Sequence, residues 1–196
     1  MLLVNANFLR GIEQNGRYSA ISTLTSTMAQ SEDFYNNVPL NIKQRRKWRF
    51  EYQRGHHFLV AENSSSENIV FIFKCINCTI TVKGTVNSVV IDQCSDVTVV
   101  LDTVGGAVGI LNSLAIRLRV RMFHKVATIS IERSNMCNIY LSSHSLDAEV
   151  ITLKSTDVAL LIPNIYGDFV RQTVPQKFST RLTQDGELET FLVIKK

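Results

Sequence analysis

One cysteine pair in the chain has a spacing that could do chemistry. Cys75 and Cys78 form a Cys-x-x-Cys motif, which in a reducing compartment can bind zinc or carry out thiol redox chemistry. The remaining cysteines, Cys94 and Cys137, form no second pair at the spacing of zinc ligands. Both cysteines of the motif also occupy columns of an internal repeat that other repeats fill with Ser, Val or Ile. We therefore predict that they pack in the core, and we expect no metal and no cofactor.

No other group of residues in the sequence indicates catalysis. The chain contains no nucleophile elbow, phosphate-binding loop or cluster of metal ligands. His56 and His57 follow Gly55 without an acidic or cysteine neighbour, so we expect them on a surface turn. The sequence therefore favours a protein that binds a partner over an enzyme, and we assign no catalytic residues.

Composition and charge narrow the class of partner. The 196 residues are 45% hydrophobic and 19% charged, which is typical of one globular domain. The net charge of +4 and the pI of about 8.9 are mildly basic and favour an acidic protein surface over nucleic acid. No apolar run approaches the roughly 18 residues of a membrane span, and the N-terminus lacks the features of a secretory signal. We therefore expect a cytoplasmic protein whose cysteines stay reduced.

The chain divides near residue 46. Residues 1–46 are polar, rich in Ser and Thr, and end in a basic run, so we interpret them as an N-terminal extension. Leu3, Ala6, Leu9 and Ile12 recur at helical spacing and predict a short helix over Leu2–Ile12. From Trp48 onward, Val, Ile, Thr and Phe alternate with polar residues, as in half-buried strands. Residues 47–196 are therefore the folded domain.

This domain contains an internal repeat. Its anchors are Cys75, Cys94, Ser113, Ser134 and Ser155, spaced by 19, 19, 21 and 21 residues. Apolar residues recur at fixed distances from each anchor: five and three residues before it, and three, five and seven residues after it. The position three residues after the anchor, for example, holds Cys78, Val97, Ile116, Cys137 and Val158. Because the anchor is always small, we expect the chain to turn a corner there.

Each repeat holds two short strands and is too short to bury its own apolar face, so neighbouring repeats must stack. Stacked repeats of about this length predict an all-β parallel β-helix of about six coils. Leucine-rich repeats have a similar length, but their leucine and asparagine pattern is missing. The open ends of such a helix need covering. Trp48–Val60 is the expected first coil or cap, and residues 177–196 read as a β-hairpin around Asp185-Gly186.

Several segments resemble one protein family. KWRFEYQ, FIFKCINCTITVKGTVNSVVIDQC, SLDAEVITLKSTDVALLIP and GDFVRQTVPQKF are similar, in order and separation, to the C-terminal domain of the cyclase-associated proteins. The resemblance implies a right-handed β-helix that forms a homodimer by exchanging C-terminal hairpins. It also implies binding of actin monomers, with preference for ADP-actin, and promotion of nucleotide exchange in support of the actin cytoskeleton.

The sequence departs from this family in three respects. The family's helical N-terminal domain and its proline-rich linker have no counterpart in the chain, which argues against binding of adenylyl cyclase. The segment LNIK near Leu40 is a poor match to the family's Wiskott-Aldrich-type actin motif.

The related tubulin cofactor C family uses an arginine in a Gln-x-Arg-x-His motif to accelerate GTP hydrolysis, and this motif is missing. A cofactor C-like regulator of a GTPase or of tubulin, or a structural dimerisation module, remains the alternative function.

The outward positions of the strands supply candidate binding residues. Alternation places Arg117, Arg119 and Arg121 on one exposed face, where they form either a solvated surface or a basic patch for an acidic protein. Nucleic acid is disfavoured, since Tyr140 is the only aromatic residue expected there. With the residues implied by the family resemblance, the candidate actin-binding set is Lys83, Arg117, Arg119, Arg121, Tyr140, Asp168, Phe169, Pro175, Gln176 and Phe178. The candidate dimerisation set is Phe178, Leu182, Asp185, Gly186, Leu188, Phe191 and Val193.

Overall fold

The computed structural model describes residues 40–62 and 64–193, so the helix expected over Leu2–Ile12 lies outside the described residues. The described elements are fifteen strands and one short 3-10 turn, η1 (Ser143–Ser145). The strands are β1 (Leu40–Gln44), β2 (Lys47–Glu51), β3 (Leu59–Ala61), β4 (Ile69–Phe73), β5 (Ile76–Val86), β6 (Ser88–Asp92), β7 (Ser95–Leu111), β8 (Arg117–Val120), β9 (Val126–Glu132), β10 (Asn135–Tyr140), β11 (Glu149–Leu153), β12 (Thr156–Pro163), β13 (Phe169–Thr173), β14 (Phe178–Leu182) and β15 (Leu188–Leu192).

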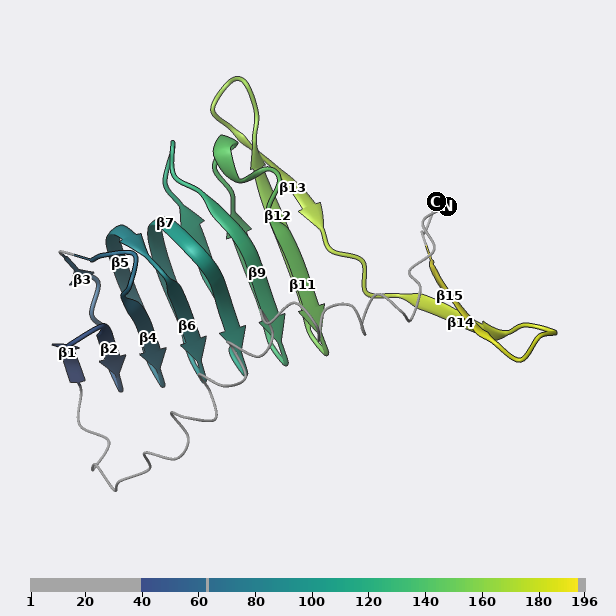
Figure 1. Cartoon of the computed structure of the whole chain (residues 1–196), viewed down its shortest axis with the longest axis horizontal. Helices are drawn as coiled ribbons and strands as arrows, with labels where there is room; N and C mark the ends of the chain where they lie inside the picture. Colours follow the sequence, from purple (N-terminus) through teal and green to yellow (C-terminus); the bar gives the residue numbers. More distant parts are fainter. Residues whose placement is uncertain (1–39, 63, 194–196) are drawn as a thin grey trace. The chain divides into compact units, whose positions relative to one another are not determined.

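Strands β2 to β12 wind into a solenoid of about five turns, which is visible as the stacked arrows of Figure 1. One side is the parallel series β2, β4, β6, the end of β7, β9 and β11. The other side, which we call the B side, is the parallel series β3, β5, the start of β7, β8, β10 and β12. The predicted parallel β-helix is thus confirmed, with about five turns where about six were expected.

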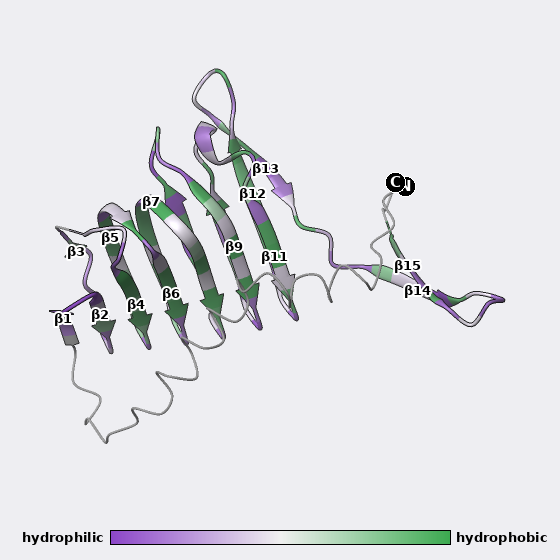
Figure 2. Cartoon of the chain, viewed as in Figure 1, coloured by the Kyte–Doolittle hydropathy of each residue, from purple (hydrophilic) through white to green (hydrophobic). Residues whose placement is uncertain are grey.

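The register of the strands places equivalent repeat positions side by side. Val89 pairs with Val108, and Val108 in turn with Ile129, so one apolar column runs through successive coils. The columns on the other side behave alike, and Val99 is flanked by Ile80 and Leu118. All of these side chains are fully buried. The predicted assignment of inward and outward positions is therefore correct, and the core is a stack of like residues; Figure 2 shows the apolar residues concentrated on the stacked strands.

The predicted corner is present in each repeat, and its backbone conformation is the same each time. The residue before each anchor and the second residue after it adopt the left-handed conformation; they are Lys74, Gln93, Asn112, Arg133 and Lys154, and Asn77, Asp96, Ala115, Met136 and Asp157. Between them the small anchor side chains bond along the stack. Ser113 Oγ donates to Leu111 O at 2.6 Å and accepts the N–H of Cys94 at 3.1 Å. A hydroxyl or thiol therefore satisfies backbone groups that the turn would otherwise leave unpaired.

The two ends of the solenoid are covered by antiparallel strands. β1 pairs with β2 at the first coil, and β13 pairs with β12 at the last coil. Among the described strands, β3 pairs only with β5 and β11 only with β9, so each end keeps one free strand edge. The inward column also opens at the last coil: Thr152 is exposed, whereas its equivalent Ile131 is buried.

Residues from Pro175 onward form a unit separate from the solenoid. Here β14 and β15 pair as an antiparallel hairpin, as the Asp185-Gly186 signal predicted. Gly186 has φ +80°, a conformation that favours glycine, and its N–H donates to Thr183 O at 3.1 Å.

Candidate functional site

The Cys-x-x-Cys motif belongs to the core. Cys75 and Cys78 are 0% and 2% exposed, and the Cys75 thiol lies 3.4 Å from Phe50 O, to which it donates. Burial raises the pKa of the Cys78 thiol, and it raises the pKa of Cys137 to about 11. No group of three or more His, Cys, Asp or Glu within residues 40–62 and 64–193 is arranged to hold a metal ion. The prediction of core packing is confirmed, while His56 and His57 are exposed as expected.

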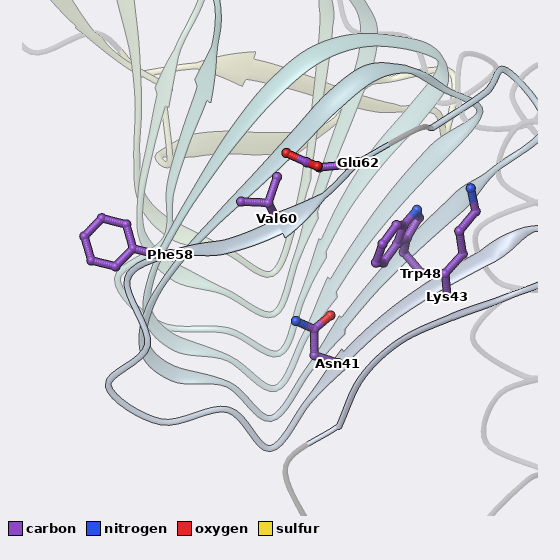
Figure 3. Close-up of a pocket in the computed structure, with 6 residues that line it drawn as sticks. All are labelled: Asn41, Lys43, Trp48, Phe58, Val60 and Glu62. Atoms are coloured by element: carbon purple, nitrogen blue, oxygen red, sulfur yellow. The ribbon is translucent and has the colours of Figure 1, made fainter.

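A hollow of about 580 Å³ opens at the first turn of the solenoid, as Figure 3 shows. It is lined by Asn41, Lys43, Trp48, Phe58, Val60 and Glu62, so none of its lining side chains is a serine, threonine or cysteine nucleophile. Glu62 is engaged by Lys83 at 2.7 Å. Its lining residues come from β1, β2 and β3 and from the residues that flank β3.

The outer face of the B side carries the predicted candidates. Arg117 and Arg119 on β8 are exposed, whereas Leu118 between them is fully buried. Arg117 lies beside Thr98 and Asn138, and Arg119 lies beside Tyr140. Arg119 and Tyr140, which were both predicted as binding residues, are therefore direct neighbours on this face.

Most basic side chains on this face are engaged by carboxylates of a neighbouring coil. Arg117 Nη1 lies 2.9 Å from Asp96, and Lys83 Nζ lies 2.7 Å from Glu62. Arg121 Nη1 lies 3.1 Å from Asp102, a buried carboxylate that also accepts the backbone N–H of Gly84 at 2.7 Å. Because the first two pairs are well exposed, each is worth at most about 1 kcal/mol. The pair at Asp102 matters more for the fold, since removing Arg121 would leave a buried charge.

Arg119 is held differently. Its guanidinium carbon Cζ lies 4.8 Å from the centroid of the Tyr140 ring, the geometry of a cation–π contact. The Tyr140 ring in turn meets the edge of Phe169, with centroids 5.3 Å apart and planes at 83°. Three predicted residues from β8, β10 and β13 thus form one cluster, the Arg119–Tyr140–Phe169 stack, in which Arg119 and Phe169 are exposed and Tyr140 is half-buried.

Sequence reasoning missed Arg171, which ties this stack together. Arg171 on β13 donates to Asn138 Oδ1 on β10 and lies 3.4 Å from Asp157. The sequence predicted no strand in this segment, but Phe169–Thr173 form a strand antiparallel to β12. The missed signal is the turn before it: Asn164 Oδ1 accepts the N–H groups of Tyr166 and Asp168, and Gly167 has φ +88°.

The remaining candidates lie elsewhere. Asp168 is exposed in the turn between β12 and β13, while Pro175, Gln176 and Phe178 belong to the hairpin unit. Within the hairpin, Phe178 pairs with Leu192 and Leu182 with Leu188, so these four side chains share one face. Phe178, Leu182 and Leu188 are 53%, 68% and 69% exposed. Phe191 lies on the opposite face, where Arg181 stacks on it at 4.7 Å.

The described part of the chain includes no helix that is long and apolar enough to cross a membrane.

Comparison with known proteins gives a consistent result. The family model described as "Adenylate cyclase associated (CAP) C terminal" matches residues 38–194. The chain is 40% identical over 135 residues to adenylyl cyclase-associated protein 1 of Homo sapiens, covering 69% of this chain and 28% of that protein. It is 37% identical over 158 residues to adenylyl cyclase-associated protein 2 of Homo sapiens, covering 81% of this chain and 32% of that protein.

A solved structure shows the same fold. The crystal structure of the cyclase-associated protein from Cryptosporidium parvum matches with a TM-score of 0.76 and 28% identity, covering 81% of this chain and 97% of that chain. The chain spans about a third of the length of the curated relatives that it matches. With the family model covering most of the sequence, the chain belongs to the adenylate cyclase-associated (CAP) C-terminal family.

Proposed function

We propose that this chain binds actin monomers, prefers the ADP-bound form, and promotes nucleotide exchange in support of actin filament turnover. Membership of the CAP C-terminal family supports an actin partner, and the observation that carries the proposal is the outer face of the B side. There the Arg119–Tyr140–Phe169 stack presents aromatic surface and a guanidinium on stacked strands. Aromatic and arginine side chains on a rigid support are typical of binding hot spots.

A binding protein accelerates nucleotide release only by differential affinity. It must bind the actin conformation from which nucleotide leaves more tightly than it binds the closed form. By linkage, preference for ADP-actin over ATP-actin means that ADP is held more tightly, relative to ATP, in the complex than in free actin. Acceleration of exchange is a separate property, because it depends on the open actin from which nucleotide leaves and not on which nucleotide is bound. The two parts of the proposal therefore need separate measurements.

We further propose that two copies of the chain exchange their hairpins. The face of Phe178, Leu182, Leu188 and Leu192 has no apolar cover within the hairpin itself, and an isolated two-stranded hairpin is marginal in water. The last coil offers what such a hairpin needs, because β11 is paired on one edge only among the described strands. A strand added to that edge in a dimer would satisfy the backbone groups of both elements.

A pulldown with ADP-actin and ATP-actin, followed by exchange of a fluorescent ATP analogue on ADP-actin, tests the proposal. We expect retention of actin, stronger with ADP, and faster exchange. If the protein neither binds actin nor changes the exchange rate, the actin proposal fails and a regulator of tubulin or of a GTPase is the next function to test. Localisation with the actin cytoskeleton in the cytoplasm is the corresponding expectation in cells.

A further inference from the structure

Arg117 and Arg119 on β8, and Arg121 directly after it, alternate in the same way in sequence but differ in what their charges contact. Arg117 and Arg121 each contact a carboxylate from the preceding coil, Asp96 at 2.9 Å and Asp102 at 3.1 Å. The other basic side chains described on this face are also engaged, Lys83 by Glu62 and Arg171 by Asp157. Within the described residues, Arg119 has no carboxylate within ion-pair distance, and its recorded partner is the Tyr140 ring.

The cation–π contact with Tyr140 leaves the N–H donors of Arg119 available for hydrogen bonds. A guanidinium carries five N–H donors in a planar fork that fits a carboxylate with two parallel bonds. An aromatic ring contacts the flat side of this group and uses none of those donors. Arg119 is exposed, so its fork is open to a partner while its orientation is fixed. Fixing a long side chain in advance removes part of the entropy that binding would otherwise cost.

The stack is itself fixed from two sides. Tyr140 and Arg119 are direct neighbours across β8 and β10, and Phe169 closes against Tyr140 from β13. Arg171 donates across β12 to Asn138 and so holds β13, which carries Phe169, against β10. Arg171 is therefore a positioning residue for the stack, and its own charge is shared with Asp157.

We propose that Arg119 is the residue of this face that recognises a carboxylate on an acidic protein partner, whereas Arg117 and Arg121 serve the solenoid itself. The inference rests on the proposed function, since the partner is the actin monomer bound by this face. Complementarity of charge supports an acidic partner, because the chain carries a net charge of +4.

The test compares variants that remove the same charge two residues apart. Dissociation constants of the full chain for ADP-actin monomers are measured by isothermal titration for wild type, Arg119→Gln, Arg119→Lys and the matched control Arg117→Gln. Arg119→Gln should weaken binding roughly tenfold to a hundredfold, the range for a hydrogen bond to a charged group. Arg117→Gln should weaken it by less than about threefold, and Arg119→Lys should recover only part of the loss because an ammonium lacks the fork.

A second pair of variants separates recognition from packing. Tyr140→Phe keeps the ring and should bind like wild type, whereas Tyr140→Leu should weaken binding as Arg119→Gln does. Thermal unfolding should be unchanged in Arg119→Gln, and its binding should depend less on salt than that of wild type.

The outcomes distinguish the inference from the function on which it rests. If wild type binds actin but Arg119→Gln and Arg117→Gln lose affinity equally, or neither loses any, the assignment of Arg119 is wrong and the proposed function stands. If wild type does not bind actin at all, the proposed function fails and the inference fails with it.

Discussion

The solenoid and the C-terminal hairpin are both built from short strands with alternating side chains, yet they bury different fractions of their apolar residues. In the coils the inward columns are closed by the coil above and the coil below, so Val99 and Leu118 are fully buried. In β14 all five residues are exposed, including Phe178 and Leu182. Alternation alone therefore does not make a core; a second layer must cover the apolar face. The solenoid supplies its own layers, and the hairpin requires another.

The largest effect is expected from a charge placed inside the solenoid. Val99→Asp puts a carboxylate between Ile80 and Leu118 with no cation in the column, at an expected cost of several kcal/mol. We expect loss of cooperative thermal unfolding by circular dichroism. Thr98→Asp, one residue away and pointing outward beside Arg117, should melt near the wild-type temperature. Equal destabilisation of the two variants would contradict the observed register.

The second-largest effect is expected from deleting the C-terminal hairpin, whose apolar face we propose is covered by a second copy of the chain. Deletion of residues 177–196 should convert a dimer into a monomer in sedimentation equilibrium, because it removes the exchanged element. The truncated chain should still unfold cooperatively, since the described core lies before residue 175. A full-length chain that is already monomeric at micromolar concentration would rule out hairpin exchange.

The repeat made most of the solenoid predictable, and the hairpin shows where such prediction stops. Columns of like residues determined the strands, their register and the corner, because each coil packs on a near copy of itself. The turn at Asn164 and Gly167 occurs once, so no repetition marked β13 or the role of Arg171. The ion pairs of the outer face were also missed: alternation shows that Arg117 and Arg121 point outward, but Asp96 and Asp102 reach them from another coil through side-chain geometry. No repeated pattern in the sequence predicts what covers the apolar face of the hairpin, which we propose is a second copy of the chain.

The reactivity of cysteine thiols should also differ between the solenoid and the hairpin. At pH 8 the raised pKa of Cys137, about 11 against an ordinary 9.0, reduces the reactive thiolate roughly a hundredfold. The neighbouring Cys75 thiol and burial also raise the pKa of Cys94. The hydrogen bond with Cys94 lowers the pKa of Cys75, but Cys75 is fully buried, so its sulfur is closed to the reagent. We therefore expect all four buried cysteines to resist iodoacetamide in the folded protein and to react in urea, as followed by mass spectrometry. The thiol introduced by Leu182→Cys, on the exposed hairpin, should react at the rate of a free thiol; equal rates in both regions would show that the coils open readily.

The fourth effect should come from the apolar face of the hairpin. Phe178→Ala removes the aromatic ring of this face, which lies across from Leu192, and should weaken dimerisation by about 1 to 3 kcal/mol if the ring is a hot spot. The change should appear mainly in the dissociation rate of the dimer. Ser179→Ala, the adjacent position on the opposite face of β14, is the matched control. If the control weakens the dimer as much as Phe178→Ala does, the apolar face is not the one that the partner covers.

The smallest effect is expected from removing exposed ion pairs, which occur in both the solenoid and the hairpin. Arg117–Asp96 on the solenoid and Arg181–Glu189 on the hairpin are cross-strand ion pairs at 2.9 Å, with arginine side chains that are 50% and 69% exposed. Because water and salt screen such pairs, each should contribute about 0.2 to 1 kcal/mol. Double-mutant cycles with Arg→Gln and Asp→Asn or Glu→Gln, measured by urea unfolding at low and high salt, test this. The solenoid cycle should report on unfolding of the coils and the hairpin cycle on dimer dissociation, and both coupling energies should fall as salt rises. A coupling above about 2 kcal/mol at Arg117–Asp96 would mean that the outer face stabilises the coils directly, and the contrast between a self-sufficient interior and a solvated exterior would no longer hold.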